Sequence, residues 1–374
     1  MEKLLGLLNW RMSNARLVSV RCGRGIFGMN GMASRRKSEV RKTLRELYAE
    51  HEGKVSDKWS IYLDAYDRIF AEFRNKPVRL LEIGVQNGGS LEIWRRYFQQ
   101  AELVLGSDIN PACGKLIFED EKIAVVVGDV NADETERDII ARSEKFDIII
   151  DDGSHRSSDI IRAFVRYFPR LAEGGIYVAE DLHCSYWQAY DGGLYDPFSS
   201  MSFFKRLLDV VNQEHWGLDR PRIDALAAFA ERNEVTFDEA SLASIYAIEF
   251  FNSLCVVRKG SSGENVLGRR IAGGRVALVE DGIVSANGTL NQPRDETKNP
   301  WSLHSTTMEM EIGINRESVK LHEAQMQALQ RELLHTRSKE KQLHDLLDAV
   351  YFSTSWRVTM PLRAAKRLLV AFRK

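Results

Sequence analysis

Two acidic pairs could do chemistry together, because each pair follows a short apolar run. Asp151 and Asp152 end one run, and Glu180 and Asp181 end the next. Ligands of an open parallel sheet bind beyond the carboxyl ends of its strands, so these side chains can converge. Several carboxylates at adjacent strand ends repel one another unless a cation neutralises them, and oxygen ligands suit a hard ion such as magnesium. The sequence therefore predicts a divalent metal at this edge.

A histidine lies close to the first acidic pair. His155 is three residues beyond Asp152, in the loop above the expected metal. A neutral imidazole there can accept a proton from a metal-polarised hydroxyl. Two other interpretations stay open. Asp152 and His155 could cap a helix that begins near Ser157, and Glu180 and Asp181 could be solvated turn residues.

A glycine-containing turn follows the first apolar run, Leu80–Ile83, and leads into a helix. Gly84, Gly88 and Gly89 let the backbone approach a ligand closely, and the N-terminus of the helix offers free N–H groups to an anion. Three residues separate Gly84 from Gly88, which departs from the G-x-G-x-x-G pattern. A dinucleotide ligand is therefore disfavoured.

Two further aspartates end the second and third runs. Asp108 follows Gly84 at roughly the spacing at which an acidic residue binds ribose hydroxyls in nucleotide sites. Asp129 is a second candidate for contact with an adenosine moiety. Either aspartate could instead cap a helix or form a turn.

These residues need a sheet to position them. From Val78 onward, short β-rich runs alternate with helical stretches, which is typical of a doubly wound, mostly parallel α/β sheet with helices on both faces. The runs Ser244–Phe250 and Ser253–Lys259 predict a terminal antiparallel hairpin. Strands are predicted at 78–84, 102–108, 123–127, 146–151 and 175–179, and helices after Ser90, Asp133, Ser157 and Ser199, with two more helices within 38–73.

The composition bounds the class of protein. The chain has 374 residues, 44% of them hydrophobic, and a formal net charge of -1, which is typical of a soluble globular protein and makes nucleic acid an unexpected partner. No apolar run approaches the roughly 20 residues of a membrane-spanning helix. The four cysteines lack metal-site spacing, which indicates a reduced compartment: Cys22, Cys113, Cys184 and Cys255. We expect a cytoplasmic protein, or one peripheral to the inner face of a membrane.

The predicted α/β domain, residues 38–262, is flanked by further segments on both sides. Residues 1–37 form a basic extension, which resembles a transit peptide or a flexible arm; alternatively, translation begins at Met32. Residues 263–312 are rich in Gly, Asn and Pro and indicate a linker or domain edge, with one candidate strand at Val276–Val279.

A long polar helix is predicted at residues 313–350. Its apolar residues recur at seven-residue spacing, which indicates either a coiled coil that makes a homo-oligomer or a single helix packed on its own domain. Residues 351–374 contain no acidic residue and predict a basic amphipathic tail. Such a tail suits an anionic membrane surface or a partner protein, or it is simply solvated.

The motifs resemble class I S-adenosylmethionine-dependent methyltransferases, in particular the metal-dependent sugar O-methyltransferases of macrolide biosynthesis and the related proteins labelled cephalosporin hydroxylase. The resemblance covers about residues 40 to 260, and its most specific part is the run DDGSH at 151–155 together with Glu180-Asp181. It also includes the segments at 56–58, 81–84, 88–91, 174–177 and 185–187.

The resemblance implies a Rossmann-like domain that uses S-adenosylmethionine and Mg²⁺. It implies that His155 is the general base. Cys184 stands where we expect threonine, in one wall of the substrate pocket. The implied metal ligands are Asp152, Glu180 and Asp181. The predicted cofactor-site residues are Glu82, Gly84, Gly88, Ser90, Asp108, Asp129 and Asp151.

We therefore expect a Mg²⁺-dependent O-methyltransferase that acts on a sugar hydroxyl of a glycan, glycolipid or glycosylated metabolite. The aromatic residues after Asp181 suit stacking on a sugar, or they are core. The ending Ser355–Arg363 looks like tails of bacterial enzymes of surface polysaccharide assembly. One alternative acceptor is a small metabolite or catechol. An alternative of another class is a non-catalytic scaffold in polysaccharide assembly, which would need none of the acidic and histidine residues of the motif.

Overall fold

The structure is a computed structural model that describes residues 41–261, 263–303 and 306–371. The basic extension predicted at residues 1–37 lies outside the described residues. Lys42 begins the unit to which all the elements below belong.

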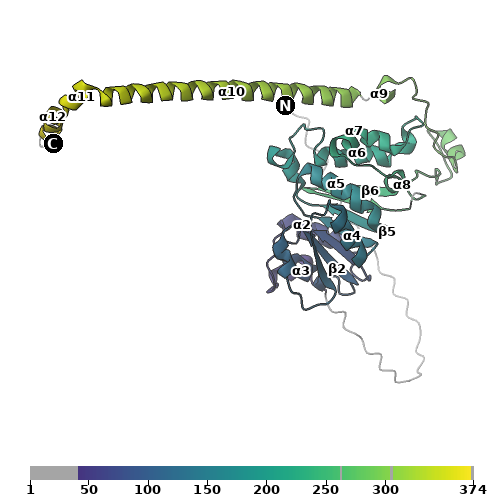
Figure 1. The fold of residues 1–374 in the computed structure, drawn as a ribbon. Coiled ribbons are helices and arrows are strands. Elements are labelled where there is room, and N and C mark those ends of the chain that lie inside the picture. The colour runs from purple at the N-terminus through teal and green to yellow at the C-terminus, as the bar shows by residue number, and fades with distance from the viewer. Residues whose placement is uncertain (1–40, 262, 304–305, 372–374) are drawn as a thin grey trace, which may run out of the picture. The chain divides into compact units, whose positions relative to one another are not determined.

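Seven strands form one sheet in the order β3-β2-β1-β4-β5-β7-β6 (Figure 1). The first five strands pair in parallel, and β7 and β6 add an antiparallel hairpin beside β5. The strands are β1 (Arg79–Ile83), β2 (Leu103–Asp108), β3 (Ile123–Val127), β4 (Phe146–Asp151), β5 (Leu171–Ala179), β6 (Ile245–Phe251) and β7 (Leu254–Lys259). The predicted fold class, a mostly parallel doubly wound sheet with a terminal hairpin, is confirmed.

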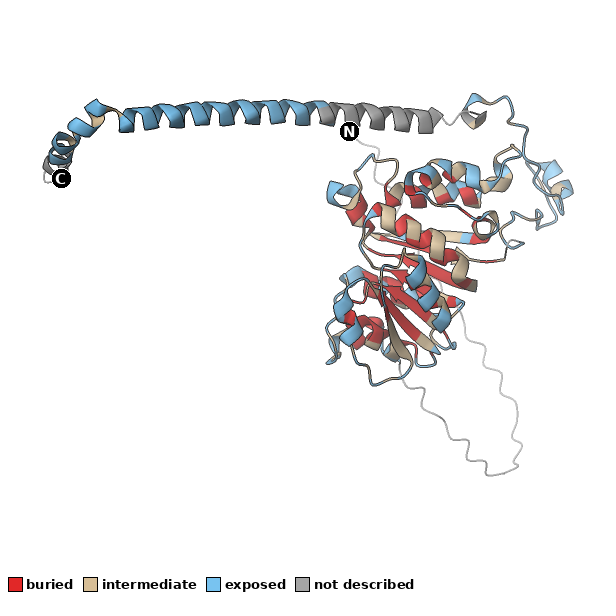
Figure 2. Ribbon diagram, in the orientation of Figure 1, coloured by how far each residue is buried: buried red, intermediate tan, exposed pale blue. Residues whose placement is uncertain are grey.

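Successive side chains of each strand point to opposite faces, and both faces are covered by helices (Figure 2). Ile148 and Ile150 pack with α1, α2 and α3, whereas Ile149 between them packs with α4, α5 and α6. The helices of the first layer are α1 (Leu44–Ala49), α2 (Ser60–Ile69) and α3 (Gly89–Tyr97), and those of the second are α4 (Asp133–Arg142), α5 (Ser157–Tyr167) and α6 (Ser200–Val211). Double coverage explains the nearly continuous apolar strands.

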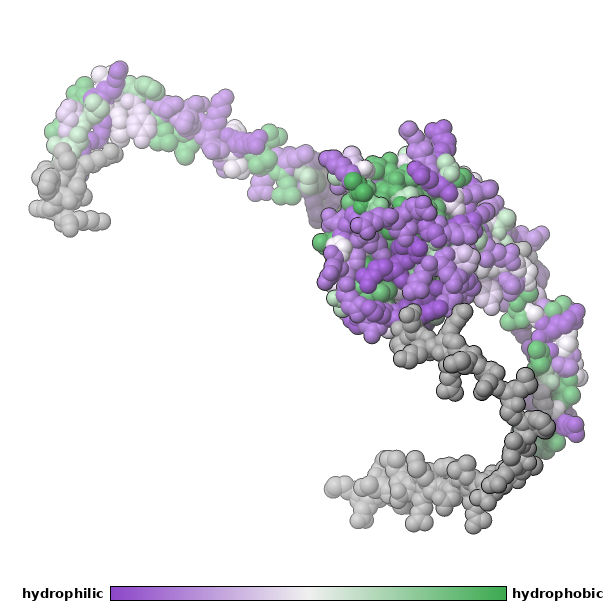
Figure 3. Space-filling model, turned by 90° about the horizontal axis from the view of Figure 1, so that it is seen from below, coloured by the Kyte–Doolittle hydropathy of each residue, from purple (hydrophilic) through white to green (hydrophobic). Residues whose placement is uncertain are grey.

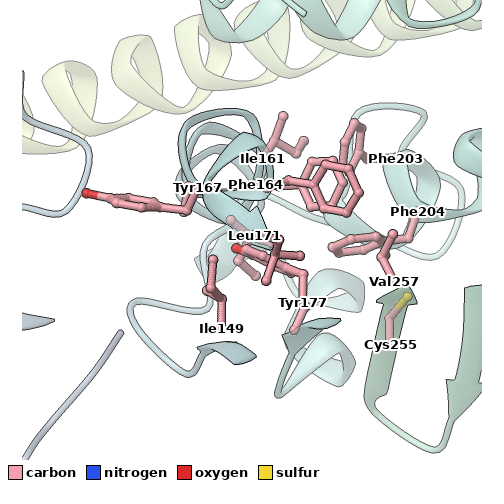
Figure 4. Close-up of a cluster of buried hydrophobic side chains, with 14 of the residues drawn as sticks. Ile149, Ile161, Phe164, Tyr167, Leu171, Tyr177, Phe203, Phe204, Cys255 and Val257 are labelled. Carbon is pink, nitrogen blue, oxygen red and sulfur yellow. The ribbon is translucent and has the colours of Figure 1, made fainter. Parts of the chain in front are cut away.

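Aromatic side chains join the second layer to the sheet (Figure 4). The ring of Phe164 on α5 contacts Tyr177 on β5 and both Phe203 and Phe204 on α6, with centroids 5.1 to 5.8 Å apart. All four side chains are fully buried or nearly so. Truncating one of them to alanine would cost about 3–5 kcal/mol. This packing fixes the helix that follows the DDGSH loop.

The chain order puts the acidic motifs at one edge. Strand β1 lies between β2 and β4, so the strand order reverses there and a crevice opens at the carboxyl ends. The residues that follow β1, β4 and β5 therefore meet. Two short helices, α7 (Ala227–Asn233) and α8 (Glu239–Ala243), lead from α6 to the hairpin.

The candidate strand at Val276–Val279 is wrong. These residues form no strand, and the side chains of Val276, Leu278 and Val279 are largely exposed. A strand needs a paired neighbour, and the pairing found in this stretch is one isolated bridge between Arg269 and Leu290.

The C-terminal part is helical: α9 (Pro300–Leu303), α10 (Thr306–Phe352), α11 (Thr354–Val358) and α12 (Met360–Ala371). Helix α10 has 47 residues and begins before the predicted position. Within the described ranges, none of the helices combines the length and the apolar character that crossing a membrane requires. The predicted domain boundaries themselves stay a prediction.

Candidate active site

Two adjoining cavities lie at the carboxyl ends of the strands. The first, of about 350 Å³, is lined by charged side chains and is called the charged cavity: Lys58, Asp108, Asp152, His155, Glu180 and Asp181, with Trp59, Gly84 and Ser90 among the others. The second, of about 230 Å³, is called the turn cavity and is lined by Gly84, Asp108, Asp129, Asp151 and neighbouring loop residues. Gly84 and Asp108 line both. Among the predicted site residues, Glu82 and Gly88 line neither.

The turn after β1 is shaped by glycine. Gly84 has a φ of +94°, and a Cβ there would lie 2.1 Å from the carbonyl oxygen of Asp152. Gly88, with a φ of +83°, is the N-cap of α3. A larger residue at Gly84 would collide with the loop that carries the acidic motif. The turn and that loop are therefore packed backbone against backbone.

Asp108 holds this turn in place. Its Oδ2 accepts the N–H groups of Val85 and Gln86 at 2.8 and 2.9 Å, and its Oδ1 accepts that of Asn110 at 2.8 Å. Burial opposes ionisation of Asp108, but the amides of Asn110, Gln86 and Val85 outweigh it and lower its pKa. The turn-forming role that the sequence left open is observed, and Asp108 also faces both cavities.

Asp129 and Asp151 face the turn cavity. Asp129 Oδ1 accepts the N–H of Asn131 at 2.9 Å, so it too forms a turn. Asp151 Oδ2 accepts the hydroxyl of Tyr177 at 2.8 Å. Burial raises the pKa of Asp151 to about 7.

Glu82 lies beneath the cavities. It is fully buried, and its two oxygens accept the Ser90 hydroxyl at 2.6 Å and the Trp94 indole N–H at 3.1 Å. Burial raises the pKa of Glu82. Glu82 therefore joins β1 to α3, and Ser90, which lines the charged cavity, is held by it.

Lys58 is the central cation of the charged cavity. Its Nζ lies 2.5 Å from Asp152 Oδ2, 2.7 Å from Glu180 Oε1 and 3.7 Å from Glu82 Oε1. The Lys58 side chain is only 3% exposed. One ammonium thus faces three carboxyl groups, which also offer oxygen ligands to a further cation. The sequence interpretation gave Lys58 no role, although Lys58 belongs to one of the segments that carried the resemblance.

The shifts of pKa follow from this crowding. Burial raises the pKa of Glu180, and the nearby Asp152 adds to the rise, while Lys58 opposes it. Burial alone would lower the pKa of Lys58, but Glu180, Asp152 and Glu82 outweigh it and raise that pKa. Tyr66 on α2 also donates its hydroxyl to Glu180 Oε1 at 2.5 Å. Lys58 is therefore protonated, and Glu180 is not a solvated turn residue.

Asp181 and His155 form the other wall. Asp181 Oδ1 accepts the indole N–H of Trp59 at 3.0 Å and the hydroxyl of Tyr62 at 2.9 Å. His155 Nε2 lies 3.7 Å from Asp181 Oδ2. Asp181 and His155 have φ values of 54° and 58°, which place both in the left-handed region. Strained backbone of this kind is found at functional sites.

Three of these residues offer a metal donor set. One ligand atom each of Asp152, His155 and Asp181 lies within 4.8 Å of the others. Glu180 Oε1 is occupied by Lys58 and Tyr66. The ligand set predicted from the resemblance, with Glu180 in place of His155, stays a prediction. The capping alternative is not observed, because the N-cap of α5 is Arg156 and no side chain caps it.

A chain of aromatic rings begins at Trp59, which lines the charged cavity and bonds Asp181. Trp59, His183, Trp187 and Tyr190 form a chain of ring contacts with centroids 5.8, 5.1 and 6.0 Å apart. Tyr190 in turn lies 6.4 Å from His155. Trp59 and Trp187 are 58% and 52% exposed, so these two rings are not core. We call these four residues the aromatic rim. Cys184 is buried and lines neither cavity.

Comparison with known proteins adds to this geometry. No family model matches the chain. The chain is 38% identical over 211 residues to 8-demethyl-8-alpha-L-rhamnosyl tetracenomycin-C 2'-O-methyltransferase of Streptomyces olivaceus, an alignment that covers 54% of this chain and 50% of the relative. This chain is similar to sugar O-methyltransferases. The resemblance predicted from the motifs is confirmed by such relatives.

A second relative of this kind is demethylmacrocin O-methyltransferase of Streptomyces fradiae, 32% identical over 241 residues, which cover 61% of this chain and 55% of the relative. The chain spans about half the length of the curated relatives it matches. Among solved structures, the MycE methyltransferase of the mycinamycin pathway, in complex with Mg, SAH and mycinamycin VI, has 27% identity and a TM-score of 0.49, covering 60% of this chain and 55% of that chain.

Proposed function

We propose that this protein is a Mg²⁺- and S-adenosylmethionine-dependent O-methyltransferase that acts on a sugar hydroxyl of a glycosylated small molecule. The observation that carries the proposal is the charged cavity, in which His155 and a carboxylate cluster adjoin a glycine turn. The similarity to sugar O-methyltransferases supports the reaction class. A scaffold would have no need for a buried lysine that faces three carboxyl groups, two of them fully buried, which is a costly arrangement.

The cofactor would lie across Gly84, between the turn cavity and the charged cavity. The close approach of backbone at Gly84 and the aspartates Asp108 and Asp129 suit an adenosine moiety with its ribose. S-adenosylmethionine, when bound, supplies an electrophilic methyl group. Asp108 and Gly84 line both cavities, so a ligand gripped there extends toward His155.

The metal would be held by Asp152 and Asp181, with Glu180 beside them. The donor set fits a hard divalent ion, because carboxylate oxygens dominate it. Mg²⁺, when bound, lowers the pKa of an acceptor hydroxyl. Lys58 keeps Asp152 and Glu180 together despite their repulsion.

His155 would act as the general base. Its Nε2 would take the proton of the acceptor hydroxyl, and the oxygen would then accept the methyl group that bound S-adenosylmethionine would supply. The resulting imidazolium finds its counter-charge in Asp181 Oδ2, 3.7 Å away. Orientation of the two substrates supplies much of the rate enhancement in such a transfer.

The aromatic rim would receive the acceptor. Trp59, which bonds Asp181, and Trp187 present exposed rings, and aromatic faces pack well against the C–H faces of sugars. A catechol could use the same carboxylates, but nothing in the rim favours it over a glycoside.

The experiment is a methyl-transfer assay with a panel of acceptors. We expect a mass increase of one methyl group on a rhamnosylated polyketide or macrolide glycoside, with Mg²⁺ required, and none on the corresponding aglycone. Methylation of catechol but of no glycoside would show that the acceptor is a catechol and not a sugar. Lack of transfer to every acceptor, in a protein that binds the cofactor, would favour the scaffold.

We also propose two roles for the C-terminal segment. Helix α10 associates with other copies of the chain, and the basic tail binds the enzyme to an anionic membrane surface. The tail has six lysines and arginines and no acidic residue after Asp348, which supports this contact. Sedimentation with phosphatidylglycerol vesicles should fall strongly in the variant R357E/R363E/K366E. Equal sedimentation of both proteins would reject the membrane contact. A role in polysaccharide assembly stays a prediction.

A further inference from the structure

The C-terminal half of α10 has an apolar stripe that nothing covers in the described part of the chain. We define this seam as the apolar side chains Met326, Leu329, Leu333, Leu343, Leu347 and Val350, each of which is about half exposed or more. Figure 3 shows hydrophobic and hydrophilic side chains side by side along this helix. A helix that is solvated on all sides would carry polar residues at such positions.

The spacing of the seam is that of a two-stranded coiled coil. Its members recur at alternating intervals of three and four residues, and Thr336 and Glu340 occupy the two middle positions of the same series. This repeat brings the seam back to one side of the helix every two turns. The seam is therefore shaped to pack against another helix with the same repeat.

Charged residues beside the seam are complementary to those of an identical helix. In a parallel, in-register pair, the residue that directly precedes a seam position such as Leu333 lies beside the partner residue whose number is five higher. Glu332 of one copy then lies beside Arg337 of the other, and the exchange is repeated by symmetry. Lys339 likewise flanks the core position of Glu340 in the other copy.

We propose that a second copy of this chain covers the seam, and that residues 326–350 form a parallel, in-register, two-stranded coiled coil. The parallel arrangement pairs Glu332 with Arg337 of the partner helix and places Lys339 between His344 and Glu340 of that helix. An antiparallel pair that keeps the apolar layers matched would put Glu332 beside Leu346 and bring the two Lys339 side chains together. The two Glu340 side chains cost stability in the parallel pair, as polar core residues do, and in return they fix the register.

Engineered cysteines test the orientation. The native Cys113, Cys184 and Cys255 are buried, so a Cys22→Ser background suffices. We expect that L329C alone and L347C alone each form a disulfide-linked dimer under mild oxidation. Leu329 and Leu347 are about 27 Å apart along one helix, so no bond can form within a chain. Dimers that appear only when both cysteines are present would show antiparallel pairing and overturn the proposal.

Sedimentation equilibrium of the full chain tests the pairing itself. The variant E340L should lower the dissociation constant of the dimer by about 10-fold or more, because it replaces the polar core layer. Asp345→Leu adds the same side chain outside the seam and should leave the constant unchanged. A monomer at all concentrations in wild type and E340L, or an equal effect of both substitutions, would overturn the proposal.

Discussion

The two cavities at the sheet edge differ in how they handle charge. In the turn cavity, Asp108 and Asp129 are satisfied by backbone N–H groups of their own loops. In the charged cavity, the carboxylates of Asp152 and Glu180 depend on Lys58, which comes from another part of the chain. The turn cavity is therefore formed by loops whose own amides hold its aspartates. In the charged cavity, the carboxyl groups are held by a lysine that is distant in the sequence.

This difference indicates that the two cavities have different functions. Backbone amides already stabilise the aspartates of the turn cavity, so a ligand can bind there without any change of protonation. The crowded carboxylates of the charged cavity repel one another and are stabilised by a bound cation. We therefore assign cofactor binding mainly to the turn cavity and chemistry to the charged cavity. Substitutions in each should separate binding from turnover.

The largest effect is expected at the charged cavity. Asp152→Ala and His155→Ala should each lower turnover by about 100-fold or more, because a metal ligand or the general base is lost. Cofactor affinity should change little in both. Turnover is measured by methyl transfer, and affinity by calorimetry with S-adenosylhomocysteine.

The matched control is Ser158→Ala. Ser158 lies at the start of α5, just after the loop that carries Asp152 and His155; its hydroxyl donates to Asp191, and it lines neither cavity. Retained turnover in Asp152→Ala or in His155→Ala would remove that residue from the mechanism.

The next effect concerns stability. Lys58→Met leaves buried carboxylates without their cation and should lower the free energy of unfolding by about 3–5 kcal/mol. Lys54→Met breaks the more exposed pair with Glu92 and should cost at most about 1 kcal/mol. Urea unfolding compares the two variants.

Magnesium sharpens this prediction. Because the metal would supply the missing positive charge, it should restore more stability to Lys58→Met than to Lys54→Met. Equal costs in the two variants would mean that Lys58 is an ordinary ion-pair residue.

A moderate effect is expected in the turn cavity. Asp108→Asn loses the charge that accepts three backbone N–H groups, so cofactor affinity should fall by about 10- to 100-fold. Asp129→Asn loses one such bond and should weaken binding by only about 3-fold. The reverse order in calorimetry would place the adenosine moiety nearer Asp129.

The smallest effect is expected at the aromatic rim. Trp187→Ala should raise the KM for the acceptor by about 3- to 10-fold, since one stacking surface is lost. Tyr195→Ala, which removes a 91% exposed ring outside the rim, serves as control. An unchanged KM in Trp187→Ala, or an equal rise in both variants, would argue that the acceptor does not use the rim.

Much of the sheet could be predicted from the sequence, because apolar runs and turn residues are local signals. Strands β3 and β4 have the predicted bounds, whereas β5 begins at Leu171 rather than at Gly175. The glycines at 174 and 175 look like a turn, yet in the structure they continue the strand. The candidate strand at Val276–Val279 failed because a run of apolar residues does not provide a pairing partner.

The site could be predicted only where its residues adjoin strand ends. Lys58 was missed because its partners Asp152 and Glu180 are 94 and 122 residues away along the chain. Tyr62 and Tyr66 lie within the predicted helical stretch 38–73, but a helix prediction cannot tell that their hydroxyls bond Asp181 and Glu180. Contacts of this range depend on the folded topology.

The most direct test of the account is calorimetric titration of S-adenosylmethionine into wild type and Asp152→Ala, each with Mg²⁺ and with a chelator. We predict that both proteins bind the cofactor, and that the wild type also shows a magnesium response that is absent from Asp152→Ala. An identical magnesium response in both proteins would move the metal away from this cluster. The absence of cofactor binding from both proteins under all conditions would contradict the methyltransferase assignment.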